Sequence, residues 1–194
     1  YGRFPFDFQA YFHAASEHEI VVTDREDGLP RYLTERSDER RLGLAAMASC
    51  SIPLLNRPVA LDGRFYYDGG VGDSIPVGRA LSKGYGKVVA VLTRRAGVYP
   101  KVGSKAQAAY RVYFRNDPQF REALLSRPAR YRAQVAYLNR LESQGRAFVI
   151  RPQVPELSHL EKNPELAASY YRHGYTWMAG RWPDLQAFLS REPE

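Results

Sequence analysis

The residues best suited to chemistry are Asp68, Gly69 and Gly70, which directly follow the aromatic run 65–67. Glycine lets a backbone take unusual dihedral angles and lets another group approach closely. An aspartate at the end of a strand and before two glycines would therefore be an uncrowded carboxylate. We predict that Asp68 is a catalytic base and that Gly69 and Gly70 form its supporting loop. The alternative is a tight turn without chemistry, since Asp and Gly favour turns for conformational reasons alone.

A second motif lies just upstream, where residues 48–53 read Ala-Ser-Cys-Ser-Ile-Pro and close an apolar helix. Together the two motifs resemble the third and fourth sequence blocks of the bacterial patatin-like phospholipases, which read roughly Ala-Ser-x-x-x-Pro and Asp-Gly-Gly/Ala. The resemblance extends from about Glu19 to Thr93. The family consists of serine acyl hydrolases, so the resemblance implies a lipid acyl hydrolase of the esterase or phospholipase A type, active in lipid degradation.

The resemblance makes Asp68 the acid of a Ser-Asp dyad, which works without the histidine of a triad. No Gly-x-Ser-x-Gly elbow occurs in the 194 residues, and the family's Gly-rich oxyanion-hole segment is missing as well. A serine hydroxyl is a weak nucleophile until a base accepts its proton, and a base alone hydrolyses nothing. We therefore expect a C-terminal portion of a longer enzyme, with the nucleophilic serine in a missing segment, and no activity from these residues alone.

The resemblance also implies the fold. We expect an α/β protein of the patatin type, with three layers and a mainly parallel central sheet, incomplete at the N-terminus and ending in a helix-rich part. Residues 1–97 would be the C-terminal part of the catalytic domain. Residues 98–194 would form a helix-rich region packed on the same domain. A dyad of this kind needs no cofactor.

Periodicity and turn signals predict the elements that must position Asp68. Asp62-Gly63 is a two-residue hairpin turn, so the strand after it would deliver Asp68. The apolar run 88–92 is typical of a buried parallel strand. Asp117-Pro118 and Asn163-Pro164 are typical of helix starts. Strands are predicted at 19–24, 31–34, 59–61, 64–67, 88–92 and 147–150, and helices at 6–15, 38–49, 77–83, 128–144, 165–178 and 184–189.

Several other reactive residue types have simpler structural interpretations. Ser74 and Asp73 precede a predicted helix, where Ser and Asp usually cap backbone donors; a second acid at Asp73 is the alternative. Ser37 is expected to cap the helix at 38–49. Cys50, the single cysteine, lies among small apolar residues and is expected to pack as a small hydrophobe. The four histidines lack metal-ligand spacing, and we expect no metal site.

Charge is the basis of a rival interpretation. Residues 94–146 hold 12 Lys/Arg against 3 Asp/Glu, a balance of +9 in a chain of net charge +7. This stripe could attract anionic lipid headgroups or nucleic acid, or its arginines could simply solvate helices. Arg94 and Arg95, directly after a strand, are the ones most expected to face a site. The alternatives to a hydrolase are a non-enzymatic basic module binding anionic membrane or nucleic acid, and a degenerate hydrolase scaffold.

Composition sets the remaining expectations. The chain is 44% hydrophobic and 25% charged, as in globular proteins. We expect a lipid or ester substrate, peripheral contact with anionic membrane through residues 94–146, a cytoplasmic location and no nucleic-acid partner. The aromatic opening, which includes Phe4, Phe6 and Phe8, and the aromatic end, which includes Tyr171 and Tyr175, are both expected in a core.

Overall fold

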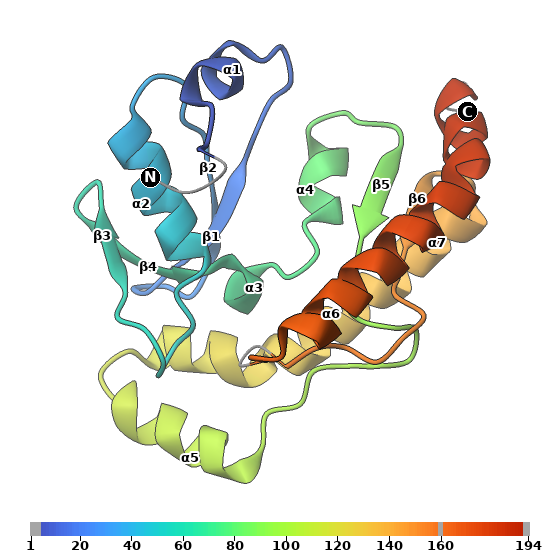
Figure 1. Ribbon diagram of the computed structural model, residues 1–194. Helices are drawn as coiled ribbons and strands as arrows, with labels where there is room; N and C mark the ends of the chain where they lie inside the picture. Colours follow the sequence, from blue (N-terminus) through green and yellow to red (C-terminus); the bar gives the residue numbers. More distant parts are fainter. Residues whose placement is uncertain (1–4, 159–160, 192–194) are drawn as a thin grey trace. The chain divides into compact units, whose positions relative to one another are not determined.

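The computed structural model describes residues 5–158 and 161–191, and its chain forms two compact units (Figure 1). One unit contains Tyr1–Ile75 and Lys101–Tyr131, and the other contains Pro76–Pro100 and Arg132–Glu194. The fold is α/β, as predicted, with an antiparallel sheet, a parallel sheet and a helical C-terminal part. The predicted division at residue 97 stays a prediction.

The sheet of the first unit is antiparallel and has the strand order β2-β1-β4-β3. Strands β3 and β4 form the predicted hairpin, in which Asp62 and Gly63 take φ values of 51° and 76°. A two-residue hairpin turn of type I′ requires positive φ at both central residues. The strands are β1 (Ile20–Asp24), β2 (Pro30–Leu33), β3 (Val59–Leu61) and β4 (Arg64–Asp68).

Helices cover both faces of this sheet. Successive side chains of a strand point to opposite faces, so Tyr66 and Tyr67 enter different clusters. Tyr66 packs with helix α2 (Glu39–Ser49) through Ala45 and Ala48. Tyr67 is 1% exposed and packs with Phe114 and Phe120, which follow helix α5 (Ser104–Tyr113) and begin helix α6 (Pro118–Ser143). Its ring stacks on Phe120 at a centroid distance of 4.9 Å.

A single helical turn, α3 (Gly69–Gly72), follows β4 and lies directly against β1. A Cβ atom on Gly69 would lie 2.2 Å from the carbonyl oxygen of Val21. No side chain fits at that distance, so glycine is required at this position for space.

Helix α2 and the β3–β4 hairpin are joined by one ion pair, between Arg41 and Asp62. Arg41 pairs with Glu35 and with Asp62 at 2.8 and 2.7 Å. Glu35 Oε1 also accepts hydrogen bonds from the backbone N–H groups of residues 36, 37 and 38. The N-cap of α2 is Asp38, which accepts from Arg41 N, so the prediction that Ser37 caps this helix is wrong. Glu35 satisfies the Ser37 N–H instead.

The second unit contains a two-stranded parallel sheet of β5 (Val88–Val91) and β6 (Ala147–Ile150), preceded by helix α4 (Val77–Ser82). Helix α7 (Pro164–Ser190) packs on β6 through Phe148, Leu185 and Phe188. The Arg181 guanidinium lies 4.4 Å from the centre of the Phe148 ring and donates to Val149 O. Asn163 caps α7, as predicted.

The two long helices continue through prolines. The helix predicted at 128–144 is part of α6, with Pro128 inside it, and those predicted at 165–178 and 184–189 are one helix, α7, with Pro183 inside it. A proline removes one helical hydrogen bond and usually ends a helix. Burial of Leu124 and Tyr131 on either side of Pro128 holds α6 together.

Several predicted core positions are exposed, and those predictions are wrong. Helix α1 (Phe8–His13) has no buried residue, and Phe6 is 58% exposed; Phe4 lies outside the described residues. Tyr171 and Tyr175 are exposed on α7, and Val91 is 72% exposed. The run 88–92 was expected to be a buried parallel strand. In the described part of the chain β5 pairs only with β6, so β5 is an edge strand and its side chains are not fully buried.

A search of the described residues for a bilayer-spanning helix, one both long and apolar enough, finds none.

We predict that Gly69→Ala destabilises the protein by about 1–3 kcal/mol, because the added methyl group forces the turn away from β1. Gly43→Ala in α2 is the matched control, since a Cβ there meets no atom within 4 Å. Alanine is favoured over glycine within helices, so this variant should be as stable as the wild type or more stable. Urea unfolding followed by circular dichroism measures both. Equal stability of the two variants would contradict the close packing of Gly69 on β1.

The hydrogen bonds from the backbone of residues 36–38 and from Arg41 lower the pKa of Glu35 from 4.5 to about 2. A carboxyl group with a lowered pKa in the folded state stabilises that state above its unfolded pKa. We therefore expect the contribution of Glu35 to be complete above about pH 4.5 and to be lost as the pH falls towards 2. Glu35→Gln should be less stable than the wild type at pH 7. Between about pH 4.5 and pH 2 its free energy of unfolding should fall less steeply with decreasing pH than that of the wild type. An unchanged pH profile of urea unfolding would contradict the assignment.

Candidate active site

The two sequence motifs meet at the backbone of Asp68. The Asp68 N–H donates to the carbonyl oxygen of Ser51 at 2.9 Å, and the Asp68 carbonyl accepts from Thr23 Oγ1 at 2.8 Å. Asp68 is the last residue of β4 and the N-cap of α3. The hairpin at residues 62–63 thus delivers the carboxylate to the end of a strand, with its backbone fixed on two sides.

The Asp68 side chain is partly exposed and accepts one hydrogen bond from the described residues. Its Oδ1 accepts a hydrogen bond from Gly70 N at 2.7 Å. Within residues 5–158 and 161–191, Oδ2 has no hydrogen bond and the carboxylate has no ion pair. A carboxylate with one oxygen oriented by the backbone and one oxygen uncommitted can accept a proton from a hydroxyl group at hydrogen-bond distance.

Thr23 was missed in the sequence analysis, and its hydroxyl joins both ends of the turn. Besides donating to Asp68 O, Thr23 Oγ1 accepts from Gly72 N at 2.9 Å. A hydroxyl group can donate one hydrogen bond and accept others, and this side chain is completely buried. In the sequence it is one of several β-branched residues in a strand, so no local signal distinguishes it.

Ser74 and Asp73 were predicted to cap helix α4, but their side chains form hydrogen bonds elsewhere. Ser74 Oγ donates to Gly70 O at 2.6 Å, while helix α4 has Pro76 at its N-cap and no side-chain cap. The prediction that Ser74 caps α4 is therefore wrong, because its hydroxyl is committed to the preceding turn. Asp73 ends α3 and accepts a hydrogen bond from the Tyr32 hydroxyl at 2.6 Å.

The motif at residues 48–53 supplies one backbone hydrogen-bond acceptor to Asp68, the Ser51 carbonyl. The Ser51 hydroxyl donates to Met47 O at 2.8 Å, and that serine is buried. Cys50 ends α2 and is exposed, so the prediction that it packs as a small hydrophobe is wrong. In the described part of the chain, no serine hydroxyl forms a hydrogen bond with Asp68.

The arginines of the basic stripe bind backbone carbonyls in several places. Arg127 Nε donates to Gly70 O at 2.8 Å, and Arg130 donates to Val71 O. Arg146 Nε donates a hydrogen bond to Gly86 O, and Arg95 forms an ion pair with Glu156. These four side chains have partners within the protein, although among the residues that the structure describes only Arg95 is paired with an opposite charge.

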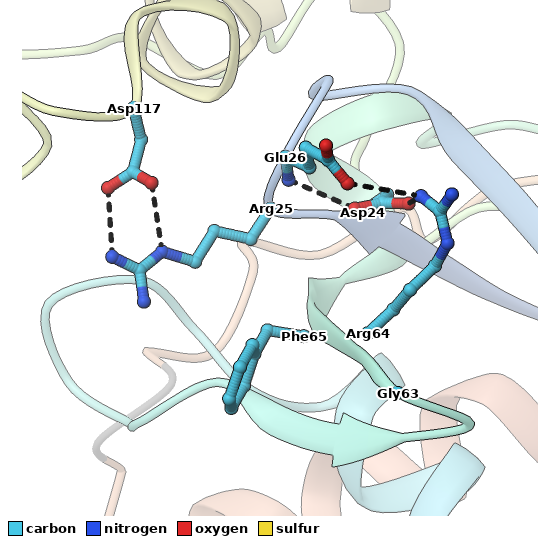
Figure 2. Close-up of a pocket in the computed structure, with 7 residues that line it drawn as sticks. All are labelled: Asp24, Arg25, Glu26, Gly63, Arg64, Phe65 and Asp117. Atoms are coloured by element: carbon cyan, nitrogen blue, oxygen red, sulfur yellow. Dashed lines mark hydrogen bonds and ion pairs between the residues drawn. The ribbon is translucent and has the colours of Figure 1, made fainter.

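A pocket of about 250 Å³ between the β1–β2 turn, the β3–β4 turn and the start of α6 is lined by charged residues (Figure 2). Arg25 forms two parallel hydrogen bonds with Asp117, at 3.2 and 2.9 Å. These bonds raise the pKa of Arg25 above its ordinary value. Asp24 is 1% exposed and pairs with Arg64 at 2.6 Å. Both arginines of this pocket are paired with acidic side chains, so it is an ion-pair network within the first unit.

The structure has two further cavities, one in each unit. A cavity of about 620 Å³ in the first unit is mainly apolar and includes Phe6, Tyr11 and Leu42 in its wall. A cavity of about 420 Å³ in the second unit is lined by Arg94, Glu156 and Tyr170. Arg94 thus faces a cavity, in agreement with its place after β5. Asp68 lines none of these three cavities.

A search of the described residues for groups of three or more His, Cys, Asp or Glu side chains that could hold a metal ion finds none. The histidines His13 and His18 instead bond to Gln9 O and Ser16 Oγ.

Comparison with known families gives two separate matches. Residues 3–81 match the family model described as patatin-like phospholipase. This part of the chain is similar to the patatin-like phospholipases, and we refer to it as the patatin-like segment. It contains both motifs, the Asp68 turn and Thr23. Residues 117–190 match a family described as a domain of unknown function, DUF6363. No individual curated protein matches the chain significantly.

The patatin-like segment confirms the predicted resemblance. Its end at residue 81 lies beyond the Asp68 turn, and the DUF6363 region begins at Asp117, the partner of Arg25. Arg127 and Arg130, which contact the turn, therefore belong to the DUF6363 region.

Proposed function

We propose that the intact protein hydrolyses carboxylic esters of lipids through an acyl-serine intermediate, with Asp68 as the acid of a Ser-Asp dyad. The observation that carries this proposal is the uncommitted Oδ2 of Asp68, on a carboxylate whose other oxygen is oriented by Gly70 N. The patatin-like match of residues 3–81 supports the choice of reaction. Gly70 leaves room beside the acid, since a Cβ there would lie 3.1 Å from Asp68 Oδ1.

The nucleophilic serine comes, in this proposal, from polypeptide outside these 194 residues. Asp68 accepts the serine proton while the serine oxygen bonds to the ester carbonyl carbon. The tetrahedral intermediate then collapses, the carbon–oxygen bond to the leaving alcohol breaks, and Asp68 returns the proton to that alcohol. Water repeats the sequence on the acyl-serine and releases a fatty acid. Backbone donors of a Gly-rich segment, also outside this chain, would stabilise the oxyanion.

The finer features of the fold and setting belong to the same proposal. In the intact protein, a mainly parallel sheet in three layers would include strands from the preceding polypeptide. The protein would be a bacterial cytoplasmic enzyme that contacts anionic membrane through exposed basic residues of 94–146. Its substrate would be a phospholipid or a simpler lipid ester.

We predict that Asp68→Asn in the full-length protein lowers turnover by about 10²–10⁴-fold, the usual contribution of a positioned general base. The variant should keep its stability, because the asparagine oxygen can still accept from Gly70 N. Hydrolysis of a short-chain nitrophenyl ester measures turnover, and thermal unfolding measures stability. Asp73→Asn is the matched control, since its carboxylate already accepts from Tyr32, and its turnover should stay within a few-fold of wild type. Retained turnover in Asp68→Asn would refute the dyad.

We also predict that residues 1–194 alone neither hydrolyse the nitrophenyl ester nor react with a fluorophosphonate, whereas the full-length protein is labelled at one serine. The reason is that a base without its nucleophile catalyses nothing. Mass spectrometry of the labelled peptides identifies the site. Turnover by the fragment would place the nucleophile within these residues. No labelling of the full-length protein would favour a degenerate scaffold.

A further inference from the structure

The DUF6363 region contacts the Asp68 turn through two arginines of α6. Arg127 Nε donates to Gly70 O at 2.8 Å, and Arg130 donates to Val71 O and to Ser126 Oγ. The carbonyls at the end of a helical turn lack partners within the helix, and here cationic side chains satisfy two of them. Hydrogen bonds from charged donors are roughly twice as strong as neutral ones.

Gly70 is the residue through which Arg127 reaches Asp68. Its N–H donates to Asp68 Oδ1 at 2.7 Å, while its carbonyl accepts from Arg127 Nε and from Ser74 Oγ. Glycine is the most permissive residue of a backbone, so the direction of this N–H depends on what holds the residue. With the carbonyl held by a guanidinium, the N–H points at the carboxylate.

The Arg127 guanidinium also lies beside the carboxylate. A Cβ built on Gly70 would be 3.1 Å from Asp68 Oδ1 and 3.4 Å from an Arg127 terminal nitrogen. The acid and the arginine therefore flank the same small space, although no direct hydrogen bond joins them. The partly buried Arg127 carries its positive charge to the edge of the candidate site.

Helix α6 is itself anchored to the strand that carries the acid. Tyr67, just before Asp68, and Val71, within the turn, are buried in one cluster with Phe114, Phe120 and Leu124. The Phe114 and Phe120 rings lie 5.8 and 4.9 Å from the Tyr67 ring. Arg127 thus extends from a helix fixed in the core of the same compact unit, as a positioning group requires.

We propose that Arg127 is a positioning residue for Asp68, and that the start of the DUF6363 region serves to hold the catalytic turn of the patatin-like segment. The proposal rests on the proposed function of Asp68. Arg127 acts by fixing Gly70, and Arg130 supports it by fixing Val71. A misplacement of about 1 Å in a catalytic group can cost about 10²-fold in rate, so loss of this contact should be visible in the kinetics.

The test uses the full-length protein and a fluorophosphonate as probe. Arg127→Met removes all donors and keeps an apolar stem, and Arg132→Met on the same helix, at an exposed position, is the matched control. Two quantities are measured for each variant: the fraction of protein labelled at saturation and the rate constant of labelling. The fraction counts folded sites, and the rate constant reports activation of the serine.

We expect Arg127→Met to be labelled to the wild-type fraction with a rate constant lower by at least about tenfold, and Arg132→Met to equal wild type in both. In ester hydrolysis the loss should fall on kcat, with KM within about twofold, since Arg127 acts through Gly70 on the position of the acid and not by binding the substrate. A lower labelled fraction with a normal rate constant would show a merely structural role and overturn the proposal. A wild-type rate constant would overturn it as well.

Two further variants keep the result unambiguous. If Arg127→Met does not fold, Arg127→Lys decides: it keeps the charge but loses the planar fork, so slower labelling supports the proposal and a wild-type rate overturns it. Asp68→Asn tests the proposed function itself. If Asp68→Asn is inactive and Arg127→Met is labelled at the wild-type rate, only the proposed role of Arg127 is refuted. If Asp68→Asn is active, both fall.

Discussion

The close contact between Gly69 and β1 determines how the candidate acid is presented. The backbone of Gly69 lies so near the carbonyl of Val21 that no side chain fits between them. The chain must therefore turn immediately after Asp68, and the buried hydroxyl of Thr23 bonds to both ends of that turn. One face of the turn is thus fixed by a strand. The turn is also held by helix α6, whose Arg127 and Arg130 donate hydrogen bonds to the carbonyls of Gly70 and Val71.

The sequence predicted the local parts of this arrangement well. The Asp62-Gly63 turn, the strand that follows it and the helix ending in the Ala-Ser-x-x-x-Pro motif all follow from residues close together in the chain. The contacts that fix the turn join residues far apart, 45 positions from Thr23 to Asp68 and 57 from Gly70 to Arg127. Such pairs leave no periodic signal in a single sequence, so Asp68 and Gly70 were identified from their motif while their distant partners Thr23 and Arg127 were not.

The net charge of a segment does not show where its arginines lie in the structure. Arg127 and Arg130 count towards the basic stripe, yet both donate to carbonyls of the turn. Guanidinium groups have five donors, which makes them effective partners for carbonyls that a short helix leaves unpaired. Burial lowers the pKa of Arg130, opposed by the nearby charges of Asp73 and Glu122. A count of arginines does not separate such residues from those facing solvent.

The boundary between the two matched families also differs from the boundary between the compact units. The patatin-like match ends at residue 81 and the DUF6363 match begins at residue 117, but residues 101–131 belong to the same unit as the Asp68 turn. Cutting the chain between the two matches would expose Tyr67 and Val71 and remove both arginines from the turn. In this chain the patatin-like segment therefore needs residues 101–131, which include the start of the DUF6363 match, to complete the core beside Asp68.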